Sequence, residues 1–98
     1  MIKKTPSKNG RTCSVTFELP AAVAGESVHV VGEFNDWSRE QTPMTKRKDG
    51  RFSATVQLEV GKRYRYRYLV DGTRWENDWA ADEYERNEFG GDDSVIEL

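Results

Sequence analysis

The sequence predicts an all-β fold, an antiparallel β-sandwich, from three observations. Short runs of alternating apolar and polar residues recur along the chain, as half-buried strands require. Turn residues, including Asp-Gly pairs at 49–50 and 71–72, separate these runs about every 8 to 12 residues. No run has the period of a convincing amphipathic helix, and residues 78–86 allow at most a turn or two.

The N-terminal half is expected to contain a tail and three strands. Residues 1–10 are polar and predict a flexible N-terminal tail, which precedes a single domain over residues 11–98. Residues 12–19 place Cys13, Val15, Phe17 and Leu19 on one face at period 2. Residues 27–34 form the second run and residues 51–60 the third. The Asp-Gly pair before the third run suits a type I′ turn, in which both central residues have positive φ.

Residues 63–70, RYRYRYLV, are the most regular segment. The tyrosines share one face and are expected to cover the core, while the arginines line the outer face. We expect this strand to lie well inside its sheet. The second Asp-Gly pair turns the chain toward residues 73–78, and DSVIEL, residues 93–98, predicts the final strand.

Composition excludes several classes of function. A chain of 98 residues is one domain, whereas barrel enzymes with deep clefts need about 200 residues or more. The net charge of −2 favours neither nucleic acid nor an anionic membrane. A single cysteine, Cys13, forms no internal disulfide and fits a reducing compartment. The N-terminus lacks the apolar run of a signal peptide, and no stretch approaches the ~18 apolar residues of a membrane span. These features predict a cytoplasmic protein.

Catalytic and metal sites find little support. His29 and Cys13 have no partner at a recognisable spacing, and adjacent carboxylates are inevitable among 17 acidic residues. Residues 71–83 are acid-rich but lack the D-x-D-x-D-G spacing of a calcium loop. We therefore expect no enzymatic activity, no metal and no cofactor.

A basic stripe makes nucleic acid the more serious rival. Lys62, Arg63, Arg65 and Arg67 lie close together, and nearby aromatic residues could stack on bases. However, residues 1–75 carry 14 basic and 8 acidic side chains, whereas residues 76–98 carry 1 and 9. The acidic segment is expected to lie beside the basic strand and neutralise it.

Tryptophans are the strongest local signal. Trp37, Trp75 and Trp79 fall in predicted loops or at loop edges. A loop indole either plugs the end of the sandwich or is held out for a partner. Trp37 and Trp75 have charged and polar neighbours, which favours the second alternative. An indole covers the apolar face of a pyranose, and planar donors and acceptors pair with its hydroxyls. Asn35 and Asp36 are expected to shape the turn at Trp37.

Four segments together resemble a known family. VHVVGEFNDWS, PMTKRKDGRFSATVQL, YRYRYLVDGTRWENDW and FGGDDSVIEL are similar, in this order, to the family 48 carbohydrate-binding modules. The family includes the glycogen-binding domain of the AMP-activated kinase β subunit and the N-terminal early-set domain of isoamylase and glycogen-branching enzymes. The resemblance covers residues 12–98 and implies an immunoglobulin-like, early-set β-sandwich.

The resemblance also implies a function and a set of residues. It implies non-catalytic binding of α-1,4-linked glucans, such as glycogen, starch or maltooligosaccharides, on a platform of two tryptophans. The family's two tryptophans match Trp37 and Trp75, and its lysine matches Arg67. Its leucine falls at Phe89 and its asparagine at Asp93. Four positions differ in residue type from the family pattern: Arg67 in place of a lysine, Phe89, Asp93, and Gly91 in place of a threonine. Asp accepts hydrogen bonds from hydroxyls but donates none, so this contact must change.

The expected partner is an α-glucan, with a glycogen-metabolising enzyme or another protein as a further partner. One alternative stays open. The chain could be a protein-interaction module that has kept the fold and lost sugar binding, with the exposed tryptophans as anchors.

Overall fold

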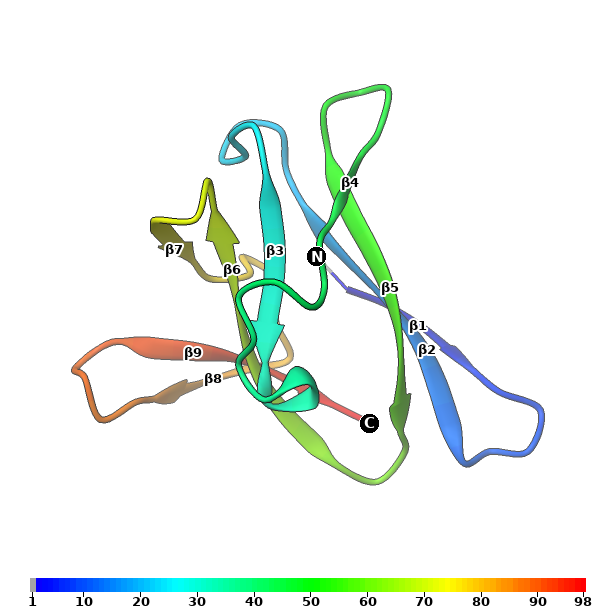
Figure 1. Ribbon diagram of the computed structural model, residues 1–98. Helices are drawn as coiled ribbons and strands as arrows, with labels where there is room; N and C mark the ends of the chain where they lie inside the picture. The colour runs from blue at the N-terminus through cyan, green and yellow to red at the C-terminus, as the bar shows by residue number, and fades with distance from the viewer. Residues whose placement is uncertain (1) are drawn as a thin grey trace.

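The computed structural model describes residues 2–98, which form two antiparallel sheets packed as a sandwich (Figure 1). This confirms the predicted all-β fold. The four-stranded sheet has the order β1 (Ile2–Pro6), β2 (Thr12–Leu19), β5 (Phe52–Glu59) and β4 (Thr45–Lys46). The five-stranded sheet has the order β3 (Val28–Gly32), β6 (Arg63–Val70), β9 (Asp92–Glu97) and β8 (Glu83–Arg86), and β7 (Arg74–Glu76) pairs with β6. A single 3-10 turn, η1 (Glu33–Asn35), follows β3.

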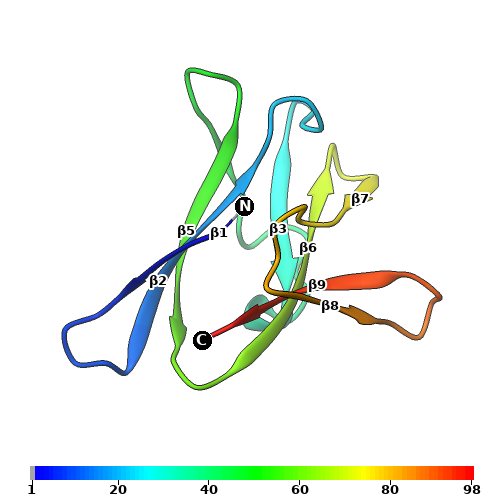
Figure 2. The same ribbon diagram turned by 180° about the vertical axis from the view of Figure 1, so that it is seen from behind.

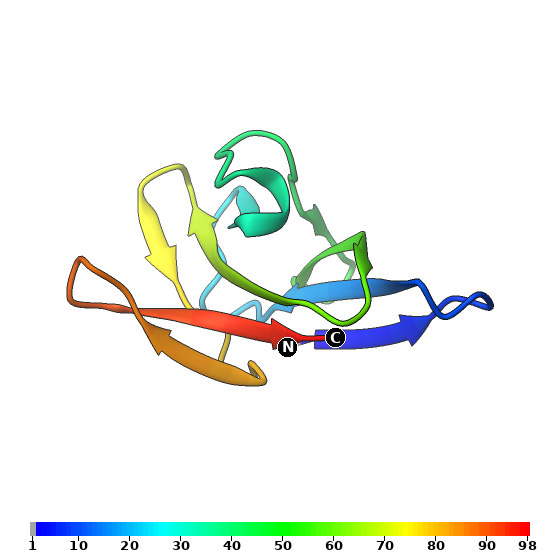
Figure 3. The same cartoon turned by 90° about the horizontal axis from the view of Figure 1, so that it is seen from below.

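The two sheets diverge at their outer hairpins. Seen from below, the β8–β9 hairpin extends away from the sandwich on one side and the β1–β2 hairpin on the other (Figure 3). The core between the sheets collects the inward faces of β2, β3, β5, β6 and β9. Its largest fully buried side chains include Tyr66, Tyr68, Phe17, Leu19 and Ile96. The predicted inward faces of β2 and β6 are thus confirmed.

The expected flexible tail is wrong for residues 2–6, which form β1. β1 pairs antiparallel with β2, from Ile2 opposite Phe17 to Pro6 opposite Cys13. Ile2 packs against the core, and the Lys4 ammonium lies 2.6 Å from the Asp82 carboxylate and 3.0 Å from the Glu97 carbonyl oxygen. The segment has one apolar side chain in contact with the core, so it carries no alternating pattern. Backbone pairing and the lysine contacts hold it in place.

β6 changes partner halfway along one of its edges. Its first half pairs with β9, from Arg63 opposite Glu97 to Tyr66 opposite Ser94. Its second half pairs with β7, from Tyr68 opposite Glu76 to Val70 opposite Arg74. Because β3 covers the other edge, β6 lies inside the sheet as predicted.

Asn77 and Asp78 close the gap where β7 and β9 separate. The Asn77 side chain donates to the Asp92 carbonyl at 2.7 Å and accepts from the Ser94 N–H at 3.1 Å. The segment from β7 to β8 then crosses the sheet on its core side (Figure 2). There the buried Asp78 carboxylate accepts from the hydroxyls of Tyr66 and Tyr68, at 2.8 and 3.0 Å. Burial, together with this carboxylate, raises the pKa of both tyrosines well above the usual range.

The two Asp-Gly turns differ. Asp71 and Gly72 both have positive φ, 53° and 72°, and the Thr73 N–H donates to the Val70 carbonyl, which fits a type I′ turn. At the first pair only Gly50 has positive φ, so the predicted type I′ turn is wrong there. The Asp49 carboxylate instead accepts the Arg51 N–H at 3.0 Å and stabilises a longer connection.

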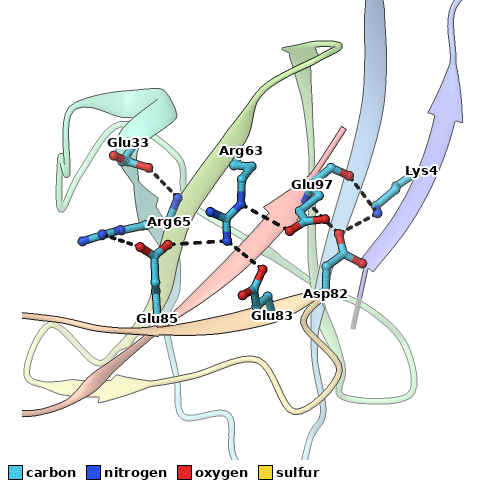
Figure 4. A network of polar contacts seen from close by, with 8 residues as sticks. All are labelled: Lys4, Glu33, Arg63, Arg65, Asp82, Glu83, Glu85 and Glu97. Atoms are coloured by element: carbon cyan, nitrogen blue, oxygen red, sulfur yellow. Dashed lines mark hydrogen bonds and ion pairs between the residues drawn. The ribbon is translucent and has the colours of Figure 1, made fainter.

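The acidic C-terminal segment lies beside the basic strand, as its charge predicted (Figure 4). Arg63 forms ion pairs with Glu83 at 2.7 Å and with Glu97 at 3.2 Å. Arg65 pairs with Glu85 at 2.8 Å. These contacts neutralise two of the three arginines on the outer face of β6.

Candidate functional site

One pocket on the outer face of the five-stranded sheet collects all five residues that the resemblance picked out. It has a volume of about 830 Å³, and its walls include Trp37, Arg67, Trp75, Phe89 and Asp93. Four further residues line it: Arg39, Arg65, Asn87 and Glu88. The residues come from three segments that lie far apart in the sequence, namely the loop after η1, the β6–β7 hairpin and the β8–β9 hairpin.

Trp37 stands on a turn that the preceding residues build. The Asn35 side chain is 5% exposed and accepts the Gly32 N–H at 3.0 Å. The same amide donates to the Val30 carbonyl and to the Thr42 hydroxyl, each at 3.0 Å. These bonds hold the 3-10 turn against β3 and against the segment after Trp37. The expected role of Asn35 in shaping the turn is confirmed.

The backbone at Trp37 is left-handed. Asp36 and Trp37 have φ values of 56° and 57°, and the Trp37 N–H donates to the Gly32 carbonyl at 2.8 Å. Left-handed backbone costs a non-glycine residue roughly 1–2 kcal/mol, and such strain concentrates at functional sites. The result is an indole that is 39% exposed and faces the pocket.

Two contacts fasten the Trp37 turn to β6. The Glu33 carboxylate accepts the backbone N–H of Arg65 at 2.7 Å, just past the last backbone pair between β3 and β6 (Figure 4). Gly32 allows the two backbones to approach, because a Cβ there would lie 2.5 Å from the Arg65 carbonyl oxygen. The position of Trp37 relative to β6 is therefore set by the Glu33 carboxylate and by the close backbone approach at Gly32.

Trp75 forms the second aromatic wall and contacts two arginines. It is half-buried on β7, opposite Leu69. The Cζ atoms of Arg39 and Arg67 lie 5.5 and 5.7 Å from the centroid of its ring, within the range of cation–π attraction. The Nε of Arg67 is buried and has no hydrogen-bond partner among residues 2–98. Other atoms of Arg67 line the pocket.

The β8–β9 hairpin forms the opposite wall. The side-chain carbonyl of Asn87 accepts the N–H groups of Phe89 and Gly91, at 3.0 and 3.1 Å, and the side-chain NH₂ donates to the Asp93 carboxylate at 3.2 Å. This places Phe89 at the hairpin tip, 88% exposed. Asp93 is only 5% exposed, and its carboxylate lies in the floor of the pocket.

The sequence analysis missed some lining residues for different reasons. Asn87 precedes a Gly-Gly pair, a pattern typical of an Asx-type turn, so it could have been found. Arg39 is an exposed loop arginine whose contact with Trp75 has no local sequence signal. Trp79, the third candidate indole, is 66% exposed and is not part of the pocket wall.

Two other kinds of site are not found within residues 2–98. No helix there has the length and apolar character needed to cross a membrane. In the same residues, no group of three or more His, Cys, Asp and Glu side chains is arranged to hold a metal ion.

This chain is similar to a glycogen-recognition family and to a glucan-branching enzyme. Residues 8–97 match the family described as the glycogen recognition site of AMP-activated protein kinase. The 1,4-alpha-glucan branching enzyme GlgB of Aquifex aeolicus (strain VF5) is 39% identical over 54 residues, which are 52% of this chain and 9% of that enzyme. The chain thus corresponds to a small part of that enzyme's length. With nearly its whole length matched, this chain belongs to the glycogen-recognition family of carbohydrate-binding modules.

Proposed function

We propose that the pocket binds α-1,4-linked glucan chains without altering them. The observation that carries this proposal is the convergence of two indoles and an arginine in one pocket. Trp37 and Trp75 would stack on the apolar faces of glucose units, and the two separate rings suit a curved chain better than a flat one. The match to the glycogen-recognition family supports this ligand class.

Polar contacts would fix the orientation of the sugar. The guanidinium of Arg67, which lines the pocket, would donate to a hydroxyl. Asp93 would accept from a hydroxyl with the lone pairs that Asn87 leaves free. Phe89, at the exposed tip, would contact the chain from the opposite wall.

Affinity should be modest. The pocket is open, and each sugar hydroxyl loses water when it binds. We expect dissociation constants between about 1 μM and 1 mM, which correspond to about 4 to 8 kcal/mol. The name of the bacterial relative supports a place for this module beside glucan-modifying enzymes. A cytoplasmic location stays a prediction.

Titration with β-cyclodextrin or maltoheptaose tests the proposal. We would follow amide NMR shifts and tryptophan fluorescence in the wild type, in Trp37→Ala and in Trp79→Ala. Trp79 lies outside the pocket wall and is the matched control. Saturable shifts at Trp37, Arg67, Trp75 and Phe89 that only Trp37→Ala abolishes would support the proposal.

Two other outcomes would reject it in different ways. No shift in the wild type at tens of millimolar sugar would favour the protein-interaction alternative. If Trp37→Ala instead unfolds, the indole is a structural plug and the site is elsewhere. Arg67→Ala should weaken binding of neutral glucan with little dependence on salt, whereas a steep salt dependence would favour nucleic acid.

A further inference from the structure

The pocket contains two arginines, Arg39 and Arg67, whose charges have no carboxylate partner among the residues that the structure describes. Among residues 2–98, no carboxylate lies within 4.0 Å of the guanidinium of Arg39 or Arg67. On the same strand as Arg67, by contrast, Arg63 and Arg65 each have carboxylate partners at 2.7 and 2.8 Å. The unpaired arginines are therefore confined to the Trp75 side of the pocket.

Both of these guanidiniums also contact the same indole. Their Cζ atoms lie within 6 Å of the centroid of the Trp75 ring. An anion in the pocket would offer acceptors to guanidinium N–H groups that have no carboxylate partner among residues 2–98.

The pocket also contains two acidic residues, Asp93 and Glu88. Asp93 is hydrogen-bonded to Asn87, and Glu88 is on the loop of the same β8–β9 hairpin. Neither carboxylate forms an ion pair with Arg39 or Arg67 among residues 2–98. A neutral sugar makes no use of this unpaired positive charge, whereas a glucan with one anionic group would be attracted by it.

We propose that the pocket selects α-glucan chains that carry a phosphate monoester, with the phosphate bound by Arg39 and Arg67 beside Trp75. This rests on the proposed function, because the sugar units still stack on the indoles. Arginine suits the ligand because its planar fork donates two parallel hydrogen bonds to one phosphate. A phosphate has enough oxygens for two guanidiniums at once, and esterification of a hydroxyl leaves the apolar face of the glucose free to stack.

Calorimetry with a matched pair of ligands tests this proposal. We would compare maltoheptaose with maltoheptaose that carries a single phosphate on one hydroxymethyl group, at low and at high NaCl. The phosphorylated ligand should bind about five to ten times more tightly at low salt, as expected for charge-assisted bonds at a partly exposed site. This advantage should shrink at high salt, because the charges are then screened.

Variants assign the effect to the arginines. Arg39→Gln should bring the ratio of the two affinities close to one, and Arg39→Lys should retain part of it, since lysine keeps the charge without the fork. Arg11→Gln is the control: Arg11 is exposed and lies outside the pocket wall, so the ratio should be unchanged.

The outcomes separate this proposal from the previous one. Equal binding of both ligands by the wild type would overturn the phosphate proposal and leave glucan binding standing. An advantage that survives in Arg39→Gln would overturn the role of Arg39. Binding of neither ligand would overturn both proposals, and binding of inorganic phosphate without either glucan would reject the glucan as the ligand.

Discussion

Replacing Asn35 with alanine should destabilise the fold and disturb the pocket together. The side chain makes three hydrogen bonds, to the Gly32 N–H, the Val30 carbonyl and the Thr42 hydroxyl. Gly32 and Val30 are buried, so water cannot replace the lost bonds at these two groups. With a cost of about 1–3 kcal/mol for each of these two buried groups left unpaired, we expect the free energy of unfolding to fall by about 2–6 kcal/mol.

Urea denaturation followed by tryptophan fluorescence measures this change, and titration with β-cyclodextrin reports the pocket. Asn9→Ala is the control. The side-chain carbonyl of Asn9 also accepts two hydrogen bonds, but it lies in an exposed turn. Asn9→Ala should lower the free energy of unfolding by less than about 1 kcal/mol and leave sugar binding unchanged. If Asn35→Ala costs no more than Asn9→Ala and binds sugar normally, Asn35 does not hold the Trp37 turn and the reasoning fails.

Three further predictions concern the fold around the pocket. Asp78→Ala should lower the free energy of unfolding by about 2–5 kcal/mol, measured in urea, because it leaves the hydroxyls of Tyr66 and Tyr68 buried without an acceptor; a loss below about 1 kcal/mol would contradict this. Asp36→Val should cost about 1–2 kcal/mol while Asp36→Gly costs little, because only glycine adopts a φ of 56° freely; equal melting temperatures for the two variants would argue against strain at this turn. The N–H groups of Ser27 and Glu26 lower the pKa of Asp71 from 3.8, so its stabilisation is present above that pH and is lost as the pH falls through the lower folded value. The difference in unfolding free energy between wild type and Asp71→Asn should therefore be larger at about pH 7 than at about pH 2.5, and a constant difference would mean that the carboxylate charge contributes nothing.

Strand faces could be predicted because their signal is local. The period-2 alternation in β2 and β6 identified the inward residues, and the sandwich confirms them. β1 was not predicted, because a segment with one isoleucine among polar residues has no alternating pattern to detect. The turn at Asp49-Gly50 was misjudged because a side-chain contact from Asp49 to Arg51 stabilises a longer connection than the dipeptide alone suggests.

The pocket shows a similar division. The five residues taken from the resemblance all line it, although their contacts with sugar stay a proposal. What no local pattern could supply is the approach of Arg39 to Trp75, two residues that are 36 positions apart in the sequence. The change of partner along β6 depends on Asn77 meeting Ser94, again a contact between separate segments.

The divided edge of β6 has a consequence for how such modules diversify. Trp75 and Phe89 belong to hairpins that attach to different halves of one strand, so each wall of the pocket has its own anchor. Insertions or deletions at residues 71–73 or 87–91 would lengthen or shorten one wall without repacking Tyr66 and Tyr68 beneath. Homologues could then evolve toward longer, shorter or more branched ligands by changing one loop at a time. The two walls would keep their relative positions, because both hairpins pair with β6.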